Sequence, residues 1–208
     1  MERLSPSYSR QNPSARYLEM LHQYEQMHAS SPLMFAGLSL TPHIGKIKKM
    51  IQDTDSKTLL DYGSGKGVLY SQKIDPETKQ FDPERGVDLK NYWGLEEIAL
   101  YDPGYPPFQK LPHKTFDAVI CTDVLEHCPR EDISWILEEI FSLSRKAVYL
   151  HIACYLAEKK LPDQTNCHVI NESPEWWQRQ ILPCASLKRV PSILTFTEME
   201  KSSWLILP

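Results

Sequence analysis

Residues 58–67 read Thr-Leu-Leu-Asp-Tyr-Gly-Ser-Gly-Lys-Gly, and this stretch limits the possible folds more than any other. Its short apolar start, with one β-branched residue, is typical of a buried parallel strand that Asp61 closes. Gly63, Gly65 and Gly67 stand at every second position, which fits neither a regular helix nor a regular strand, so the backbone must turn tightly or approach another group closely. An acid at a strand tip, followed by a glycine loop and a helix start, predicts a ligand site on an open α/β sheet.

Residues 59–67 resemble motif I of the class I S-adenosylmethionine-dependent methyltransferases. In that family the glycine loop packs against the methionine portion of the cofactor, and the acid reaches its amino end. The nicotinamide fingerprint needs Gly-x-Gly-x-x-Gly, so the spacing disfavours a nicotinamide oxidoreductase. A tight turn without a ligand is the structural alternative. The resemblance implies that S-adenosyl-L-methionine is bound by Asp61, Gly63, Ser64, Gly65 and Gly67.

A second acid, Asp102, ends the next predicted strand, over residues 97–102. In open α/β sheets an acid at this place can accept hydrogen bonds from both ribose hydroxyls, and the resemblance implies that role for Asp102. The sequence Asp-Pro-Gly at 102–104 is also a simple turn signal. The distance along the chain from the glycine loop is longer than the family's usual one, which we attribute to an irregular surface insertion over residues 75–92.

The phrases Phe-Asp-Ala-Val-Ile at 116–120 and Thr-Asp-Val-Leu-Glu-His at 122–127 resemble the family's fourth strand and the loop after it. That loop sits over the transferring methyl group. The resemblance therefore implies that Asp123 contacts the cofactor and contributes to catalysis. His127 offers a general base. The alternative is that Glu126 and His127 only hold the loop in place.

The same phrase has a second interpretation. Asp123-x-x-Glu126-His127 is similar to the metal-binding phrase of small-RNA 2′-O-methyltransferases and of some quinone O-methyltransferases. With His151 or His168 as a further ligand, Mg²⁺, Mn²⁺ or Zn²⁺ would polarise a substrate hydroxyl. The spacing does not identify the third ligand, and the leading prediction includes no metal.

Candidates on the substrate side come from the last third of the chain. His151 ends the strand predicted over 147–153 and is a second candidate base, although a buried core histidine is an equal alternative. His168 lies in a loop flanked by prolines, where functional residues are common. We expect Tyr155, His168 and Trp176 to line the substrate pocket.

The remaining pattern predicts one α/β domain with a doubly wound, mostly parallel sheet and a C-terminal antiparallel hairpin. Residues 1–40 would form an N-terminal helical lid, 41–155 the cofactor-binding core, and 156–208 a substrate-side helix and the closing hairpin. Only the thirteen residues 103–115 stand where the family fits a helix and a third strand, so we expect that strand to be short or absent. Helices are predicted over 14–28, 42–53, 68–73, 131–144 and 174–182, and the hairpin strands over 194–197 and 204–207.

Composition favours a small polar substrate, such as a sugar or a nucleotide-linked metabolite. The net charge is −4 and no dense Lys/Arg cluster occurs, which makes nucleic acid an unfavoured partner. Five cysteines without a Cys-x-x-Cys pair indicate reduced thiols and a cytoplasmic protein, and no apolar run reaches membrane-spanning length. We therefore predict methyl transfer from S-adenosylmethionine to an oxygen or nitrogen atom of a small metabolite. The alternatives are a metal-assisted RNA 2′-O-methyltransferase and a non-catalytic protein that binds S-adenosylmethionine; the oligomeric state is left open.

Overall fold

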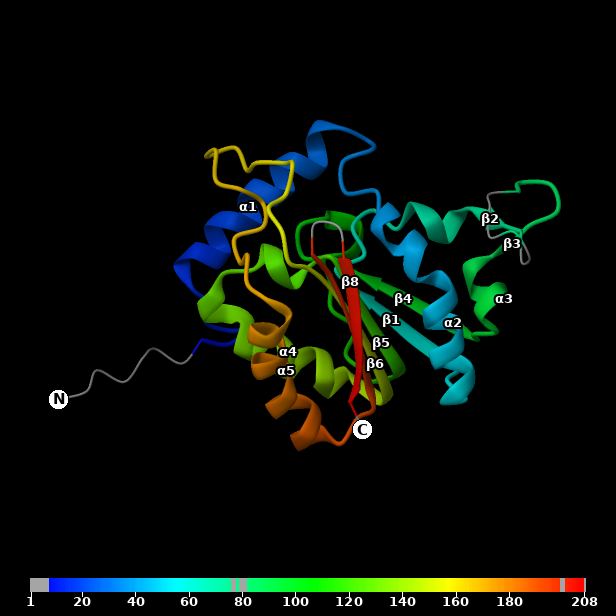
Figure 1. Ribbon diagram of the computed structural model, residues 1–208. Helices are drawn as coiled ribbons and strands as arrows, with labels where there is room; N and C mark the ends of the chain where they lie inside the picture. Colours follow the sequence, from blue (N-terminus) through cyan, green and yellow to red (C-terminus); the bar gives the residue numbers. More distant parts are fainter. Residues whose placement is uncertain (1–7, 76–77, 79–81, 199–200, 208) are drawn as a thin grey trace.

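A six-stranded sheet forms the centre of the computed structural model, which describes residues 8–75, 78, 82–198 and 201–207 (Figure 1). The strand order is β4-β1-β5-β6-β7-β8. Neighbours from β4 to β7 run parallel, and only β8 is antiparallel to its partner β7. This confirms the mostly parallel sheet with a C-terminal antiparallel pair. The strands are β1 Thr58–Tyr62, β4 Glu97–Tyr101, β5 Phe116–Thr122, β6 Ser144–Ala153, β7 Ser192–Glu198 and β8 Lys201–Leu207.

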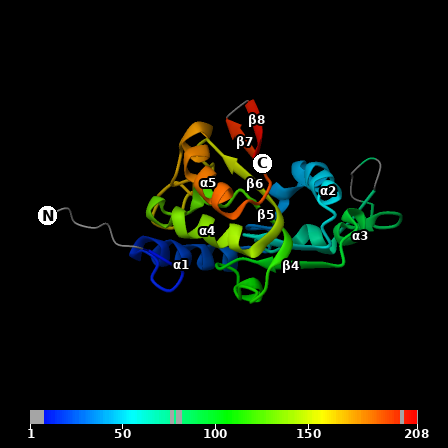
Figure 2. The same cartoon turned by 90° about the horizontal axis from the view of Figure 1, so that it is seen from below.

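Helices cover both faces of the sheet, as a doubly wound fold requires (Figure 2). On one face, α2 (Ile44–Asp53) and α3 (Leu89–Trp93) bury their apolar side chains against β1, β5 and β6. On the other face, α4 (Ile133–Leu143) and α5 (Pro174–Lys188) enclose a second apolar cluster. The central strand β5 is buried at every position, because both of its faces are covered.

The first helix, α1 (Ala15–Ser30), lies across the carboxyl ends of the parallel strands (Figure 1). Ser14 caps its first turn and also hydrogen-bonds the buried Asp132 beside α4. Just before the helix, Arg10 forms an ion pair with Glu139 of α4. Residues 8–14 are therefore docked on the core; residues 1–7 lie outside the described part.

The chain after the glycine loop differs from the prediction. The helix expected over 68–73 is a single 3-10 turn, Val68–Ser71, because Gln72 is extended and leads directly into β2 (Lys73–Ile74). β2 pairs antiparallel with β3 (Val87–Asp88), so the insertion expected over 75–92 is a small ribbon followed by α3. Residues 76–77 and 79–81 of this insertion are outside the described part.

β4 forms one of the two edges of the sheet. The described residues 103–115 contain a 3-10 turn, Pro106–Phe108, and no strand. The prediction that the third strand is short or absent is confirmed, and prolines in this short connection explain why no longer element forms there.

Candidate functional site

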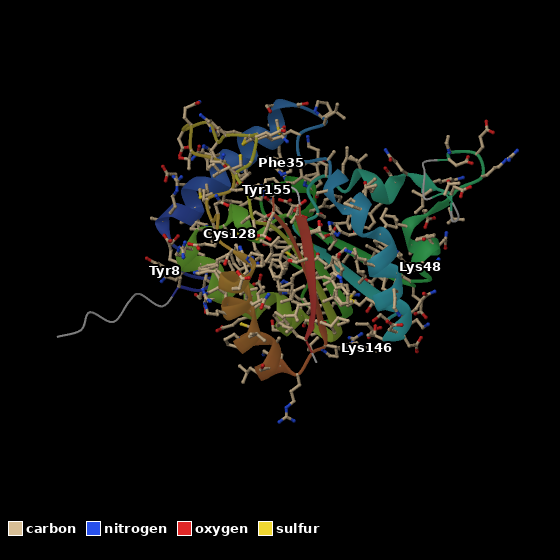
Figure 3. The ribbon with its side chains drawn as sticks, in the orientation of Figure 1. Tyr8, Phe35, Lys48, Cys128, Lys146 and Tyr155 are labelled. Carbon is tan, nitrogen blue, oxygen red and sulfur yellow. The ribbon has the colours of Figure 1, made fainter. Side chains whose placement is uncertain are left out.

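A cavity of about 160 Å³ opens between α1 and the carboxyl ends of β1, β4 and β5. This is the edge where open α/β sheets bind their ligands. In Figure 3, Phe35 and Tyr155 lie at this end of the molecule, whereas Lys146 lies at the opposite end. The walls come from α1 and the chain after it (Tyr17, Met20, Leu21, Tyr24, His28, Phe35, Gly37, Ser39), from the glycine loop (Gly63, Gly65), and from the segments after β4 and β5 (Asp102, Pro103, Gly104, Thr122, Asp123, Val124, His127, Cys128, Pro129).

The glycine loop is closed from outside by the chain at 35–37. Gly65 has φ +56°, and a Cβ atom there would lie 2.3 Å from the backbone oxygen of Phe35. That oxygen accepts a 2.8 Å hydrogen bond from the Lys66 N–H, and the Ala36 oxygen accepts one from Val68. The close approach that the sequence predicts for this loop is thus made to another part of the chain.

The side chain of Lys66 joins this loop to α1. Its ammonium group donates a 2.9 Å hydrogen bond to the backbone oxygen of His28 and a second one to that of Ser31. These carbonyls belong to the last turn of the helix and its C-cap, where backbone oxygens lack intrahelical partners and a cation is favourable. The position of α1 over the cavity is therefore linked to the conformation of the glycine loop.

Two buried carboxylates lie at the strand tips. Asp102 accepts hydrogen bonds from the Gly65 N–H (2.8 Å) and the Gly104 N–H (2.9 Å), and burial raises its pKa. Asp61 accepts a 2.8 Å hydrogen bond from the Tyr70 hydroxyl, while its other oxygen is buried without a partner in the described structure. Burial raises the pKa of Asp61 to about 7.

These groups fit S-adenosylmethionine. A buried carboxylate oxygen without a partner is costly and would be satisfied by a cationic amino group, and Asp102 has further lone pairs that face the cavity. The enclosed volume is below the about 300 Å³ at the lower end for ligand pockets. We expect α1 or the chain at 35–37 to shift outward when a cofactor enters.

Asp123 occupies a left-handed backbone conformation, with φ +53°, directly after β5. Its N–H donates to the His151 backbone oxygen (3.1 Å), and its Oδ1 lies 3.3 Å from His151 Nε2. Burial raises the pKa of Asp123 to about 6. Burial, with His43 next to it, lowers the pKa of His151 to about 3, and the ring hydrogen-bonds Thr195 at 2.9 Å. His151 stands behind the cavity wall.

Glu126, His127 and His168 form a cluster beside the cavity, with one ligating atom of each within 4.8 Å of the other two. Glu126 is fully buried; one oxygen accepts a 2.8 Å hydrogen bond from the Ala153 N–H, and the other has no partner in the described structure. Metal–ligand distances of about 2.1 Å place tetrahedral ligands of one ion about 3.4 Å apart, so the cluster would have to contract by up to about 1.4 Å. The residues fit a divalent cation, and His168 rather than His151 completes the set.

Burial, with His168 beside it, lowers the pKa of His127 to about 3. A neutral imidazole is the form that binds a metal ion. As a general base at neutral pH, however, the same group is weak. The low pKa therefore argues against the role of general base that the sequence suggests for the half-buried His127.

The structure separates the predicted site residues into three groups. Gly63, Gly65, Asp102, Asp123 and His127 line the cavity. Four others lie behind the cavity wall: Asp61, Ser64, Gly67 and His151. Tyr155 and His168 lie at the Glu126 cluster.

Trp176 is not part of this site. Trp176 belongs to α5, and its ring centroid lies 4.6 Å from the Arg130 guanidinium. It does not line the cavity. The neighbouring Trp177 is fully buried in the core.

Several wall residues were not predicted as site residues. The α1 residues 17, 20, 21, 24 and 28 recur at helical spacing within the segment 1–40 that the sequence predicts as a lid, although none of them was assigned to the site. Ser39, Cys128 and Pro129 carry no local signal of a site. Nothing in the sequence around Lys66 indicated that its side chain bonds to the end of α1.

Comparison with known proteins agrees with this geometry. A family model described as "Methyltransferase domain" matches residues 42–190. The chain therefore belongs to the class I S-adenosylmethionine-dependent methyltransferases, a family that implies use of this cofactor.

Among curated proteins, the chain is similar to the ubiquinone biosynthesis O-methyltransferase of Paramagnetospirillum magneticum (strain ATCC 700264 / AMB-1), with 28% identity over 126 residues. The match covers 55% of this chain and 48% of that protein, so the chain spans about half the length of the curated relative it matches. Within the described residues, no helix is long and apolar enough to cross a membrane.

Proposed function

We propose that this protein transfers the methyl group of S-adenosylmethionine to a hydroxyl oxygen of a small polar molecule. The observation that carries the proposal is the Glu126, His127 and His168 cluster, which adjoins the cavity through His127. The bound cofactor would supply an electrophilic methyl group on a sulfonium, and most of the rate would come from positioning the acceptor oxygen in line with it.

The chain's own residues would hold the cofactor as follows. Asp102 accepts hydrogen bonds from the ribose hydroxyls, and the free oxygen of Asp61 accepts one from the amino group. Asp123 lies between the cavity and His151, where its carboxylate faces the positively charged end of the cofactor. His168 of the Glu126 cluster and Tyr155, whose ring centroid lies 5.5 Å from that of His168, are expected to contact the acceptor.

A hydroxyl acceptor must lose its proton, and the neighbouring histidines are poor bases because burial lowers the pKa of both His127 and His151 to about 3. A divalent cation at the cluster would lower the pKa of a bound hydroxyl. Two imidazoles and one carboxylate suit Zn²⁺ or Mn²⁺ better than Mg²⁺. The O-methyltransferase activity named for the curated relative supports an oxygen acceptor.

The experiment has two steps. Calorimetric titration of the purified protein with S-adenosylmethionine, S-adenosylhomocysteine and NAD should show micromolar binding of the first two and none of NAD. Transfer from methyl-labelled cofactor is then measured against small sugars, nucleotides, phenols and short RNAs, with chelator or with added Mn²⁺, Zn²⁺ or Mg²⁺.

Metal-dependent labelling of a small hydroxyl compound supports the proposal, and the loss of labelling in Glu126→Gln would assign it to the cluster. Labelling of RNA alone would favour the RNA 2′-O-methyltransferase alternative. Labelling of amines that is insensitive to the chelator would overturn both the oxygen acceptor and the metal. Cofactor binding without any transfer would favour the non-catalytic alternative.

A further inference from the structure

Tyr24 of α1 touches two parts of the site at once. Its side chain lines the cofactor cavity and packs edge-on against Phe35, with ring centroids 5.5 Å apart. Its hydroxyl lies 2.9 Å from His127 Nδ1 and donates to the Cys167 backbone oxygen at 3.2 Å. No other residue of α1 hydrogen-bonds a member of the Glu126 cluster in the described structure.

The number of available protons indicates which atom donates in the hydrogen bond between the Tyr24 hydroxyl and His127 Nδ1. Tyr24 has one hydroxyl proton, and the backbone oxygen of the fully buried Cys167 needs a donor. With that proton given to Cys167, the Tyr24 oxygen must accept from His127 Nδ1. A proton on His127 Nε2 instead would have no hydrogen-bond partner, since the nearby free oxygen of Glu126 makes no hydrogen bond. His127 therefore carries its proton on Nδ1 and presents the lone pair of Nε2.

The backbone oxygen of Tyr155 holds His168 in the same tautomer, with the proton on Nδ1. Its Nδ1 lies 2.5 Å from the backbone oxygen of Tyr155, which can only accept, so its Nε2 is also free of a proton. Both imidazoles thus keep a lone pair on Nε2, and each ring has a nitrogen within 4.8 Å of a Glu126 carboxylate oxygen. Two imidazole lone pairs and one carboxylate oxygen are a donor set that a divalent cation binds.

We propose that Tyr24 is a positioning residue for a divalent-metal site: its hydroxyl holds His127 in the tautomer that offers Nε2 to the ion. The inference rests on the proposed function, because it takes the cluster to be a metal site. It gives α1 a second role: the ring of Tyr24 forms part of the cavity wall, and the hydroxyl of Tyr24 contributes to metal affinity.

The test uses two variants of the full chain. Tyr24→Phe keeps the ring on the cavity wall and removes the hydroxyl. Tyr17→Phe is the matched control, because Tyr17 lines the same cavity from the same helix and its hydroxyl makes no hydrogen bond that the structure shows. Each chelator-treated protein is titrated calorimetrically with Mn²⁺, with Zn²⁺ and with S-adenosylhomocysteine.

We expect Tyr24→Phe to lose about 10- to 100-fold in metal affinity, as is typical when a group that orients a metal-bound histidine is removed. Its affinity for S-adenosylhomocysteine should stay within about twofold of the wild type, and Tyr17→Phe should match the wild type in metal affinity. Equal metal affinity in Tyr24→Phe and wild type would overturn the inference and leave the proposed metal site standing. A wild-type protein that binds neither ion would instead remove the metal site itself, and the inference with it.

A second measurement needs neither the metal nor the variant. Nitrogen NMR of the histidine rings in the metal-free wild type reports which ring nitrogen carries the proton. A protonated Nδ1 and a bare Nε2 on His127 are expected, and the opposite tautomer would overturn the inference even if Tyr24→Phe failed to fold.

Discussion

Replacing Gly65 by alanine tests how the glycine loop is built. The backbone at Gly65 has φ +56°, which costs a non-glycine residue about 1–2 kcal/mol. The new Cβ would also stand 2.3 Å from the Phe35 oxygen, so one of the two chains must move. Movement would break the 2.8 Å hydrogen bond from the Lys66 N–H, worth about 0.5–1.5 kcal/mol. The total expected loss of unfolding free energy is about 1.5–3.5 kcal/mol.

Gly94 provides the matched control. It has a similar φ of +72°, and a Cβ atom there would meet nothing within 4 Å. Gly94→Ala should therefore cost only the backbone term of about 1–2 kcal/mol. The gain from a less flexible unfolded chain applies to both variants and cancels in their difference. Urea unfolding at equilibrium measures both values, and titration with S-adenosylhomocysteine measures the effect on the site.

The two readouts separate two explanations of the loop. If the chain at 35–37 closes the loop, Gly65→Ala is the less stable variant and also binds S-adenosylhomocysteine more weakly, because Phe35 and Gly37 are cavity walls. Gly94→Ala should retain wild-type affinity. Equal stability losses in the two variants would refute the close packing of Gly65 on Phe35. A loss of affinity in Gly65→Ala without extra instability would mean that the glycine serves the cofactor directly.

Three further predictions follow from the buried charges. Asp61→Asn should flatten the pH dependence of stability, because the wild-type carboxyl loses its proton near pH 3.8 when unfolded but only near pH 7 when folded. Its contribution is fully present below pH 3.8, falls by about 1.4 kcal/mol per pH unit between these two values, and changes no further above pH 7. Chemical unfolding between pH 4 and 8 would check this, and parallel curves for the two proteins would contradict it. Lys66→Met should lower the free energy of unfolding by about 1.5–3 kcal/mol, because the backbone carbonyls of His28 and Ser31 lose a charged hydrogen-bond donor. It should also raise the rate of amide hydrogen exchange in the last turn of α1, and an unchanged rate there would show that other contacts hold the helix end. Asp102→Ala should weaken S-adenosylhomocysteine binding by about 1.5–3 kcal/mol, or roughly 10- to 150-fold in calorimetry, and wild-type affinity would leave Asp102 as a turn residue.

Local patterns in the sequence were sufficient for most of the sheet. The apolar run ending at Asp61 and the continuous apolar strand before Asp123 correspond to β1 and β5, two neighbouring inner strands of the sheet. Such strands are identifiable because burial on both faces requires apolar residues at consecutive positions. The short connection over 103–115 likewise indicated correctly that no third strand is present in that described segment.

Contacts between residues that are far apart in the sequence could not be predicted from local patterns. The partner of Gly65 is Phe35, thirty residues earlier, and nothing near either residue indicates the pairing. Likewise, the spacing Asp-x-x-Glu-His at 123–127 could not identify the third member of the cluster. His168 joins it because the chain after β6 returns to β5, where the Ile170 N–H donates to the Glu126 backbone oxygen. The low pKa of His127 is also a consequence of burial, which the sequence does not give.

The division of the cavity wall also suggests where specificity lies. The family match starts at residue 42, and it contains the carboxylates, the glycine loop and the Glu126 cluster. The opposite wall, from Tyr17 to Ser39, lies entirely before the match. Because the cofactor-binding half is shared across the family, discrimination between acceptors is expected to depend on α1 and the chain at 35–39. Through Lys66 and Tyr24, the wall from Tyr17 to Ser39 is nevertheless bonded to the glycine loop and to the Glu126 cluster, so a change in this wall would also affect cofactor and metal binding.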